Sequence, residues 1–292
     1  MQGRLLENEP MSKHTSWRAG GPADRYYIPS GLDDLGRFLA SLPETEPLYW
    51  VGLGSNLLVR DGGLRGTVIA TSGALKRLQL LDNHIVRAEA GVASAKAARF
   101  SVDHKLEGAE FLAGIPGTVG GALAMNAGAF GGETWNIVES VETLDRYGNL
   151  HHRPASEFNV SYRHVVTPPD EWFVAAHFRL HPRTDNAADG KAVIKSLLTR
   201  RGSTQPMQTA NAGSVFKNPQ GNFAARLIES CGLKGNCIGK ACVSEVHANF
   251  IINTGNATAN DIEQLIGKIR ETVKAETGIA LEPEVRIVGE AT

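Results

Sequence analysis

The sequence has few cysteines, almost no net charge and no apolar run at its amino terminus, and each absence excludes a class of protein. Only 3 of its 292 residues are cysteine, and 30 Lys and Arg residues nearly balance 31 Asp and Glu residues, which leaves a formal net charge of −1. The odd cysteine count argues against a secreted disulfide framework. The balanced charge argues against a strongly cationic protein that binds nucleic acid or a membrane surface. Because the first residues, MQGRLLENEPMSKH, contain no signal-peptide core, we expect a cytoplasmic protein.

The three cysteines, Cys231, Cys237 and Cys242, lie close together in the sequence. Their spacing matches neither a Cys-x-x-Cys metal site nor a redox motif. We therefore predict three reduced thiols in a partly buried segment, and no metal site.

A charge-free run of 22 residues, FLAGIPGTVGGALAMNAGAFGG at 111–132, is long enough to span a bilayer. It contains seven glycines and a proline, however, which disfavour a continuous helix. We predict a buried loop with a short helix near its middle. Glycines leave backbone N–H groups accessible, and such groups suit an anion, above all a pyrophosphate.

The hydrophobic pattern predicts an α+β protein in which helices and strands alternate irregularly. We expect helices at 31–41 (entered by a capping Ser30), 92–108, 191–201 and 260–278, and strands within 48–63 and at 84–92, 138–144, 172–180 and 283–289. The polar, turn-rich stretch 181–191 predicts a domain boundary.

Ordinary nucleotide-binding motifs are incomplete. Gly52 and Gly54 begin a G-x-G, but Leu57 stands where a Rossmann fingerprint needs its third glycine. The stretch GNCIGKA at 235–241 is one residue too short for a P-loop and ends on Ala241, which has no hydroxyl for magnesium. Neither type of site is predicted.

Three segments, KHTSWRAGGPAD (13–24), VGLGSNLLV (51–59) and LAGIPGTVGGALAMNAGA (112–129), resemble the FAD-binding domain of vanillyl-alcohol-oxidase-like (PCMH-type) flavoproteins. SYR (161–163), AGSVFKNP (212–219), VHANFIIN (246–253) and PEVRIVG (283–289) follow in the order found in the UDP-N-acetylenolpyruvoylglucosamine reductase family. The resemblance runs from about residue 12 to the end. It implies a PCMH-type FAD-binding domain at 12–182, with two subdomains divided near 70–80, and a smaller α/β substrate-binding domain at 190–292.

The resemblance also implies an activity, namely the NADPH-dependent reduction of UDP-N-acetylglucosamine enolpyruvate to UDP-N-acetylmuramate through noncovalent FAD, in peptidoglycan precursor synthesis. The expected partner is a UDP-sugar, with no nucleic acid and no membrane, and the expected state is a monomer. An FAD-dependent oxidase of another substrate, or a noncatalytic module that binds UDP-sugars, stays open as an alternative.

The family match assigns three catalytic residues. Ser214 is the proton donor, and its weak acidity needs a cation or a hydrogen-bonding chain, for which Lys217 is the nearest candidate in sequence. Arg163 is the enolate stabiliser, because its planar, permanent cation matches a developing carboxylate dianion. Glu284 is the second stabiliser, and it is more useful protonated, since an ionised carboxylate would repel the enolate.

For FAD the resemblance points to two glycine-rich segments. Their candidate residues are Gly52, Gly54, Ser55, Asn56, Gly114, Ile115, Pro116, Gly117, Thr118, Gly120, Gly121, Asn126 and Gly128. The candidates for the UDP-sugar are Lys217, Asn218, Arg200 and Arg201, an amide and three cations suited to a sugar and a diphosphate.

One feature of the longer reductases is missing. Only seven residues separate Arg163 from Glu171, where the next strand is about to begin. There is no room for the insertion whose tyrosine closes over the substrate in the longer subgroup. The chain therefore resembles the shorter subgroup, and the sequence does not indicate which residue covers the substrate.

Overall fold

The computed structural model describes residues 2–184 and 189–292, which form two compact units. Unit 1 consists of Met1–Leu6, Tyr26–Gly52 and Thr67–Arg201, and unit 2 of Glu7–Arg25, Leu53–Gly66 and Gly202–Thr292. The mixture of helices and sheets confirms the α+β class. The boundary expected at 181–191 includes 185–188, which lie outside the described residues, and the division at 12–182 and 190–292 stays a prediction.

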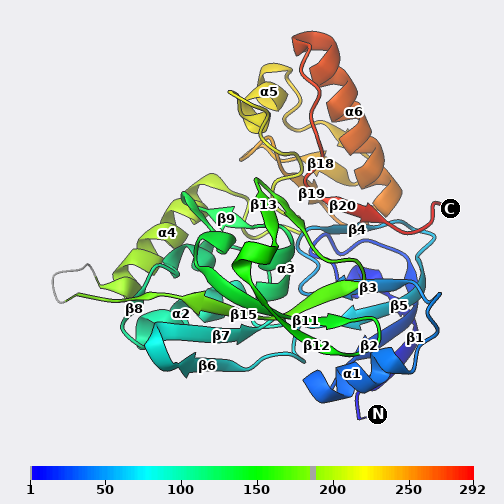
Figure 1. Cartoon of the computed structure of the whole chain (residues 1–292). Coiled ribbons are helices and arrows are strands. Elements are labelled where there is room, and N and C mark those ends of the chain that lie inside the picture. The colour runs from blue at the N-terminus through cyan, green and yellow to red at the C-terminus, as the bar shows by residue number, and fades with distance from the viewer. Residues whose placement is uncertain (1, 185–188) are drawn as a thin grey trace. The chain divides into compact units, whose positions relative to one another are not determined.

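Unit 1 is built on an antiparallel sheet of five strands in the order β12-β11-β15-β7-β6 (Figure 1). The strands are β6 Leu78–Leu81, β7 Ile85–Glu89, β11 Val138–Asp145, β12 Leu150–Pro154 and β15 Glu171–Arg179. Successive side chains of a strand point to opposite faces. Apolar residues such as Val86, Val141 and Phe178 therefore share one face and join the hydrophobic core with α2 (Ser94–Asp103) and α3 (Val119–Ala124).

Helix α2 is shorter than the predicted 92–108. It ends at Asp103 because Lys105 adopts a left-handed backbone with φ 57°, and the short strand β8 (Leu106–Glu107) follows. Helix α3 confirms the predicted short helix within the glycine-rich segment. Helix α4, Gly190–Thr204, extends a few residues beyond the predicted 191–201.

A second sheet has the strand order β1-β2-β5-β3. Helix α1 (Leu32–Ala40) lies between β2 and β3 in the sequence. The strands are β1 Arg4–Pro10, β2 Pro22–Ile28, β3 Leu48–Val51 and β5 Leu64–Ala70. The predicted cap of α1 is wrong, since Gly31 is its N-cap and no side chain caps it. Instead, the N–H of Ser30 donates to the carboxylate of Asp34 at 3.1 Å.

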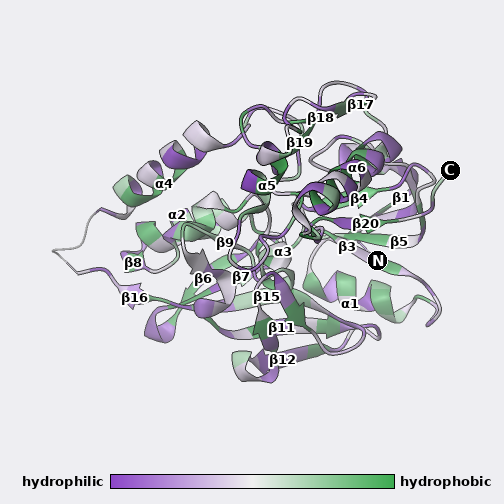
Figure 2. Ribbon diagram, turned by 90° about the horizontal axis from the view of Figure 1, so that it is seen from above, coloured by the Kyte–Doolittle hydropathy of each residue, from purple (hydrophilic) through white to green (hydrophobic). Residues whose placement is uncertain are grey.

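Unit 2 contains the longest helix, α6, Ala259–Thr277. Thr258 and Asp261 form a reciprocal capping box at its start, and Gly278 ends it with a left-handed φ of 74°. The predicted apolar stripe is confirmed as core, for Ile262, Leu265 and their helical neighbours are at most 3% exposed. Figure 2 shows the hydrophilic residues of α6 interspersed with this stripe.

The prediction of three reduced thiols is wrong for two of them. Strands β17 (Cys237–Ile238) and β18 (Ala241–Val243) form a hairpin in which Cys237 lies opposite Cys242, and the two are joined by a disulfide. Their Cα atoms are only 4.1 Å apart, because residues that face each other across an antiparallel pair lie close together. Cys231 is free and partly buried.

The remaining elements are short. The other strands are β4 Leu57–Val59, β9 Gly128–Ala129, β10 Gly132–Glu133, β13 Asn159–Ser161, β14 His164–Val166, β16 His181–Pro182, β19 Ile251–Asn253 and β20 Arg286–Val288. Helix α5 is Ala224–Ser230. Strand β20 pairs in parallel with β4, so the end of the chain lies beside the first glycine loop. None of the described helices is both long and apolar enough to cross a bilayer.

Candidate functional site

The backbone around Ser214 is fixed from one side by Asn249. The amide of Asn249 donates to the carbonyl of Phe216 at 2.8 Å and accepts from the N–H of Phe216 at 3.0 Å. The backbone carbonyl of Asn249 also accepts from the N–H of Val215 at 2.9 Å. Because Asn249 and Phe216 are both buried, these bonds are shielded from water. The segment that carries Ser214 is therefore held rigidly.

The other side of this segment is bound by residues 282–284. The N–H of Glu284 donates to the carbonyl of Val215 at 2.8 Å, and the N–H of Lys217 donates to the carbonyl of Glu282 at 2.9 Å. The structure thus brings two of the three predicted catalytic residues, Ser214 and Glu284, onto adjacent backbone segments of unit 2. Ser214 is partly exposed, and its hydroxyl has no hydrogen-bond partner among the described residues.

Asn56, a predicted FAD residue, joins this group. Its side-chain amide donates to the carbonyl of Glu284 at 3.1 Å, and its own carbonyl accepts from the N–H of Arg286 at 3.0 Å. The end of the first glycine loop is therefore anchored to the segment that carries a predicted catalytic carboxyl.

The first glycine loop makes a turn that only glycine fits at position 54. Gly54 has φ +60°, and a Cβ atom there would lie 2.0 Å from the carbonyl oxygen of His14. The carbonyl of Gly54 accepts from the N–H of Ser16 at 3.1 Å, so the resembling segment 13–24 packs against this loop. In the described part of the chain, the N–H groups of Leu53, Gly54 and Ser55 donate to no acceptor. Such neighbouring donors suit a diphosphate, so the loop fits FAD.

The second glycine segment uses most of its backbone donors within the protein. The N–H of Gly120 donates to Ala90 at 2.9 Å, and that of Gly117 donates to Ile115 at 3.0 Å. Thr118 caps α3 by accepting from the N–H of Gly121. A Cβ on Gly52 would lie 2.3 Å from the hydroxyl of Thr118, so both predicted FAD segments approach each other here. Small residues in this segment therefore serve close packing as well as any ligand.

Asn126 is buried, and its side chain is fully engaged. It donates to Glu133 at 2.9 Å and to the carbonyl of Ser161 at 3.2 Å, and it accepts from the N–H of Trp135 at 3.2 Å. The side chain of Asn126 therefore holds this segment against Glu133, Ser161 and Trp135.

Arg163 lies beside this same segment in unit 1. Its guanidinium donates to the carbonyl of Asn126 at 3.3 Å and to that of Gly128 at 3.2 Å, and it lies over the ring of Tyr162. Arg163 follows strand β13 and adopts a left-handed φ of 55° at the turn into β14. The structure thus places the predicted enolate stabiliser against two predicted FAD residues.

The candidates for the UDP-sugar have partners within the protein. The ammonium of Lys217 forms an ion pair with Glu282 at 2.6 Å, so a diphosphate would have to compete with this carboxylate for Lys217. The side-chain oxygen of Asn218 accepts from the N–H of Ala224 at 3.1 Å, at the start of α5. Arg200 and Arg201 lie near the end of α4, where burial lowers the pKa of Arg201.

Asn249 is the residue that sequence reasoning missed. It belongs to VHANFIIN, a segment noted only for its family resemblance. Its N–H donates to Nδ1 of His247 at 3.2 Å, and burial lowers the pKa of His247, which favours the neutral ring that can accept this bond. A polar amide between apolar residues was the available signal, because buried amides are almost always hydrogen-bonded.

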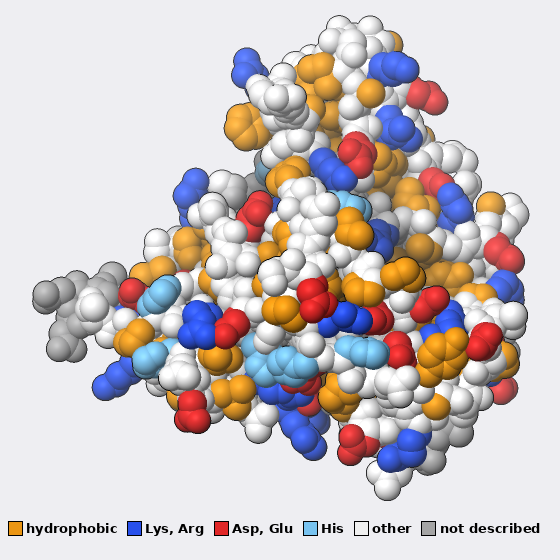
Figure 3. All heavy atoms as spheres, in the orientation of Figure 1, with side chains coloured by type: hydrophobic (Ala, Val, Ile, Leu, Met, Phe, Trp, Pro, Cys, Tyr) orange, Lys and Arg blue, Asp and Glu red, His pale blue; other side chains and the backbone are white. Residues whose placement is uncertain are grey.

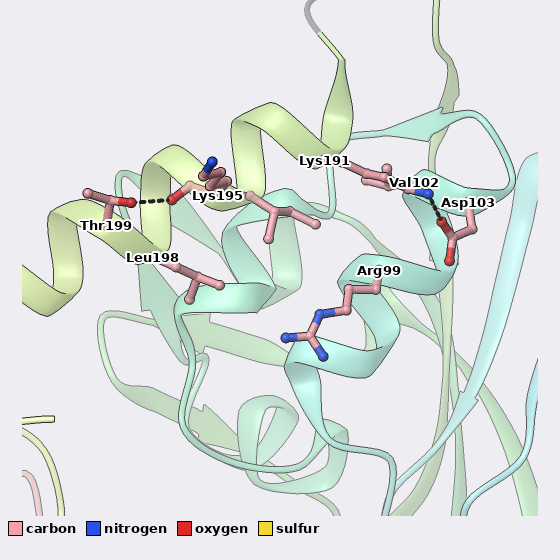
Figure 4. A pocket seen from close by; sticks show the side chains of 8 residues that line it. Arg99, Val102, Asp103, Lys191, Lys195, Leu198 and Thr199 are labelled. Atoms are coloured by element: carbon pink, nitrogen blue, oxygen red, sulfur yellow. Dashed lines mark hydrogen bonds and ion pairs between the residues drawn. The ribbon is translucent and has the colours of Figure 1, made fainter. Parts of the chain in front are cut away.

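A cavity elsewhere in unit 1 contains none of the predicted residues. It has a volume of about 650 Å³ and lies between α2 and α4 (Figure 4). Val102, Ile194 and Leu198 form its apolar wall, and Lys191 pairs with Asp103 at 3.0 Å at its edge. The hydrogen bonds described above, and not this cavity, define the candidate site.

Comparisons with known proteins identify the family that the chain resembles. Residues 23–153 match the model of the FAD binding domain family, and residues 205–288 match that of the UDP-N-acetylenolpyruvoylglucosamine reductase C-terminal domain. The UDP-N-acetylenolpyruvoylglucosamine reductase of Methylococcus capsulatus is 57% identical over 99% of this chain and 95% of its own length. The reductase of Alkalilimnicola ehrlichii is 58% identical over 99% of this chain and 96% of its own length. The crystal structure of the Thermus caldophilus reductase (MurB) covers 98% of this chain and 99% of its own, with a TM-score of 0.83 and 31% identity.

Proposed function

The chain belongs to the UDP-N-acetylenolpyruvoylglucosamine reductase family, and we propose that Ser214 donates the proton of the reaction while Arg163 and Glu284 stabilise its negative charge. The enzyme is an FAD-containing oxidoreductase of peptidoglycan precursor synthesis. It reduces the enolpyruvyl ether of UDP-N-acetylglucosamine to the lactyl ether of UDP-N-acetylmuramate, with NADPH as reductant.

FAD supplies the hydride chemistry when bound, since it takes a hydride from NADPH and passes one to the terminal vinyl carbon of the substrate. Negative charge then develops on the neighbouring carbon and its carboxylate. The protein must neutralise that charge, deliver a proton to carbon on one face, and keep the reactants aligned and dry.

Ser214 delivers the proton. Two observations support this role. The backbone that carries Ser214 is held from one side by Asn249 and from the other by Glu284. The Ser214 hydroxyl itself has no hydrogen-bond partner among the described residues. A fixed backbone sets the face from which a proton arrives. A serine hydroxyl is a weak acid, so its transfer depends on the strong basicity of the enolate carbon. Lys217 pairs with Glu282, and any help it gives Ser214 must compete with that ion pair.

Arg163 and Glu284 stabilise the developing charge. Two backbone carbonyls hold the Arg163 guanidinium, whose planar, permanent positive charge matches a developing carboxylate dianion. Glu284 acts in its protonated form, as a hydrogen-bond donor to the developing negative charge. Both interactions strengthen as charge builds, so they lower the barrier and do not simply tighten binding.

The loop Gly52, Gly54, Ser55 and Asn56 binds the FAD diphosphate, and the segment from Gly114 to Gly128 packs beside the cofactor. Lys217, Asn218, Arg200 and Arg201 bind the UDP-sugar. We place the enzyme in the cytoplasm, where its UDP-sugar and NADPH are made, as a monomer that binds neither nucleic acid nor membrane. Its net charge of −1 supports the last point.

Ser214→Ala tests the proton transfer. In stopped-flow experiments we expect reduction of the flavin by NADPH to stay within about twofold of wild type, while reoxidation by substrate slows by about 100-fold or more, within the usual contribution of a general acid. Ser230→Ala is the matched control, because Ser230 is an α5 serine whose hydroxyl donates to the carbonyl of Leu227 at 2.9 Å and which no prediction places in the site. Wild-type rates in both half-reactions of Ser214→Ala would remove Ser214 from the mechanism.

A further inference from the structure

Two histidines and a glutamate meet on the face of the five-stranded sheet that is turned away from the core. Glu142 of β11 lies directly opposite His152 of β12. His177 of β15 lies opposite Ser140, two residues before Glu142, so its side chain points to the same face. Figure 3 shows histidine side chains gathered on the surface over these strands. The side chains of Glu142 and His177 are 7% and 11% exposed, whereas that of His152 is 59% exposed.

The three potential ligand atoms are close enough to share one ion. Nε2 of His177 lies 2.8 Å and Nε2 of His152 lies 3.9 Å from the same oxygen, Oε1 of Glu142, and all three atoms lie within 4.8 Å of one another. Ligands of a tetrahedral zinc ion, bound at about 2.0–2.2 Å, are roughly 3.3 Å apart. To meet that geometry, Nε2 of His177 and Oε1 of Glu142 must separate by about 0.5 Å, and the exposed His152 ring must approach Oε1 by about 0.6 Å.

Arg87 and Glu89 set the charge around this cluster. Arg87 donates from Nε to Oε1 of Glu142 at 2.7 Å and from Nη2 to Oε2 at 2.6 Å, and its Nη1 lies 3.5 Å from Glu89. Arg87 therefore holds both oxygens of the Glu142 carboxylate, and His177 contacts one of them. Two carboxylates and one guanidinium leave one negative charge to receive a cation. Arg87 orients the carboxylate but also reduces its affinity for metal.

We propose that Glu142, His152 and His177 form a site for a first-row divalent cation, with zinc as the ion that best suits two imidazoles and one carboxylate. Nε2 of His177 and Oε1 of Glu142 each offer a lone pair to the ion, and any proton shared between them is released to solvent when the ion binds. A water molecule completes the fourth position. The ion links β12 to β15 across β11, so it stabilises the sheet by mass action. The site is separate from the residues of the reductase reaction, and its test does not depend on them.

Calorimetric titration of the chelator-treated FAD enzyme with Zn²⁺ tests the site. We expect one ion per chain in the micromolar range, and a rise in the thermal midpoint on binding. His177→Gln and His152→Gln should each weaken binding about tenfold or more, as loss of a metal ligand does. His151→Gln is the control, because His151 points to the opposite face of β12 and pairs with Asp145 at 3.0 Å.

Cobalt(II) adds a spectroscopic measurement. Bound to two imidazoles and a carboxylate, it should give ligand-field bands at longer wavelengths than the flavin absorption, and these bands should disappear in His152→Gln. Because His152 is exposed, this variant should fold even if His177→Gln does not. Absence of stoichiometric binding by the wild type, or equal binding by wild type and His152→Gln, would overturn the proposal. An equal loss of zinc binding in the control variant His151→Gln would also overturn the proposal.

Discussion

Asn249 illustrates how a single buried amide can fix the backbone that carries a predicted catalytic residue. It satisfies the N–H and the carbonyl of Phe216 with its own side chain, and its backbone accepts from Val215. An alanine there would leave two buried backbone groups of Phe216 unpaired, each at a cost of about 1–3 kcal/mol. The position of Ser214 therefore depends on a residue 35 positions later in the chain.

Gly54→Ala tests the first glycine loop at the scale of one residue. A non-glycine residue at φ +60° costs roughly 1–3 kcal/mol, and the new Cβ would also displace the carbonyl of His14. We expect FAD affinity, measured by flavin fluorescence on titration of the apoprotein, to fall by about tenfold or more.

Gly267→Ala is the matched control for that substitution. Gly267 lies within α6, has no atom within 4 Å of its Cβ position and has no left-handed φ. Alanine should stabilise the helix by roughly 0.5–1 kcal/mol and leave FAD affinity unchanged. Equal FAD affinities in both variants would show that the loop at Gly54 does not bind the cofactor.

Sequence reasoning at this scale identified residue types better than their partners. Ser214, Arg163 and Glu284 could be named because whole motifs carried them. The ion pair of Lys217 with Glu282 could not be foreseen, since it joins residues 65 positions apart. The same holds for Asn126, whose amide is used by Glu133, Ser161 and Trp135 within the protein. Long-range hydrogen bonds leave no periodic trace in a sequence.

At the scale of elements, helix α1 is joined to the strand before it by a buried carboxylate. Asp34 accepts from the hydroxyl of Tyr27 at 2.6 Å and from the N–H groups of Gln2 at 2.7 Å and Ser30 at 3.1 Å. Burial opposes its ionisation, but these donors outweigh burial and lower the pKa of Asp34 from 3.8 to about 2. Asp34 therefore stabilises the fold above about pH 4, and this contribution is lost as the pH falls towards 2.

Asp34→Asn should lower the stability of unit 1 at pH 7 by about 2–3 kcal/mol, which is the free energy that corresponds to a pKa lowered from 3.8 to about 2. The deficit relative to wild type should shrink as the pH falls from about 4 to about 2, because wild type then protonates Asp34. Thermal midpoints across this range provide the measurement. Asp33→Asn is the control, since Asp33 is the exposed neighbour on the same helix. Parallel pH profiles for the two variants would contradict this account of Asp34.

Elements with a strong local signal were predicted well. The apolar period of α6, its start and its terminal Gly278 all lie in one stretch of sequence, and the helix begins and ends close to the predicted residues. Helix α2 was predicted too long because Lys105, Leu106 and Glu107 all favour a helix, whereas the left-handed backbone of Lys105 ends it. The disulfide was missed because the pairing of β17 with β18, and not the cysteine spacing, brings Cys237 opposite Cys242.

At the scale of the whole molecule, distant stretches of chain assemble each unit. Unit 2 takes Glu7–Arg25 and Leu53–Gly66 together with Gly202–Thr292, so three separate stretches of the sequence form it. This assembly lets Asn56, from the first glycine loop, hold the carbonyl of Glu284 near the end of the chain. The family could be recognised from motifs alone, but these contacts between its motifs required the structure.

The central claim is that this chain carries hydride from NADPH through FAD to an enolpyruvyl UDP-sugar, and one anaerobic experiment tests it most directly. The purified protein is reduced with one equivalent of NADPH, UDP-N-acetylglucosamine enolpyruvate is added, and the flavin absorbance is followed. We expect the oxidised spectrum to return with formation of stoichiometric UDP-N-acetylmuramate. A flavin that is bleached by NADPH and stays bleached after addition of this substrate would contradict the account.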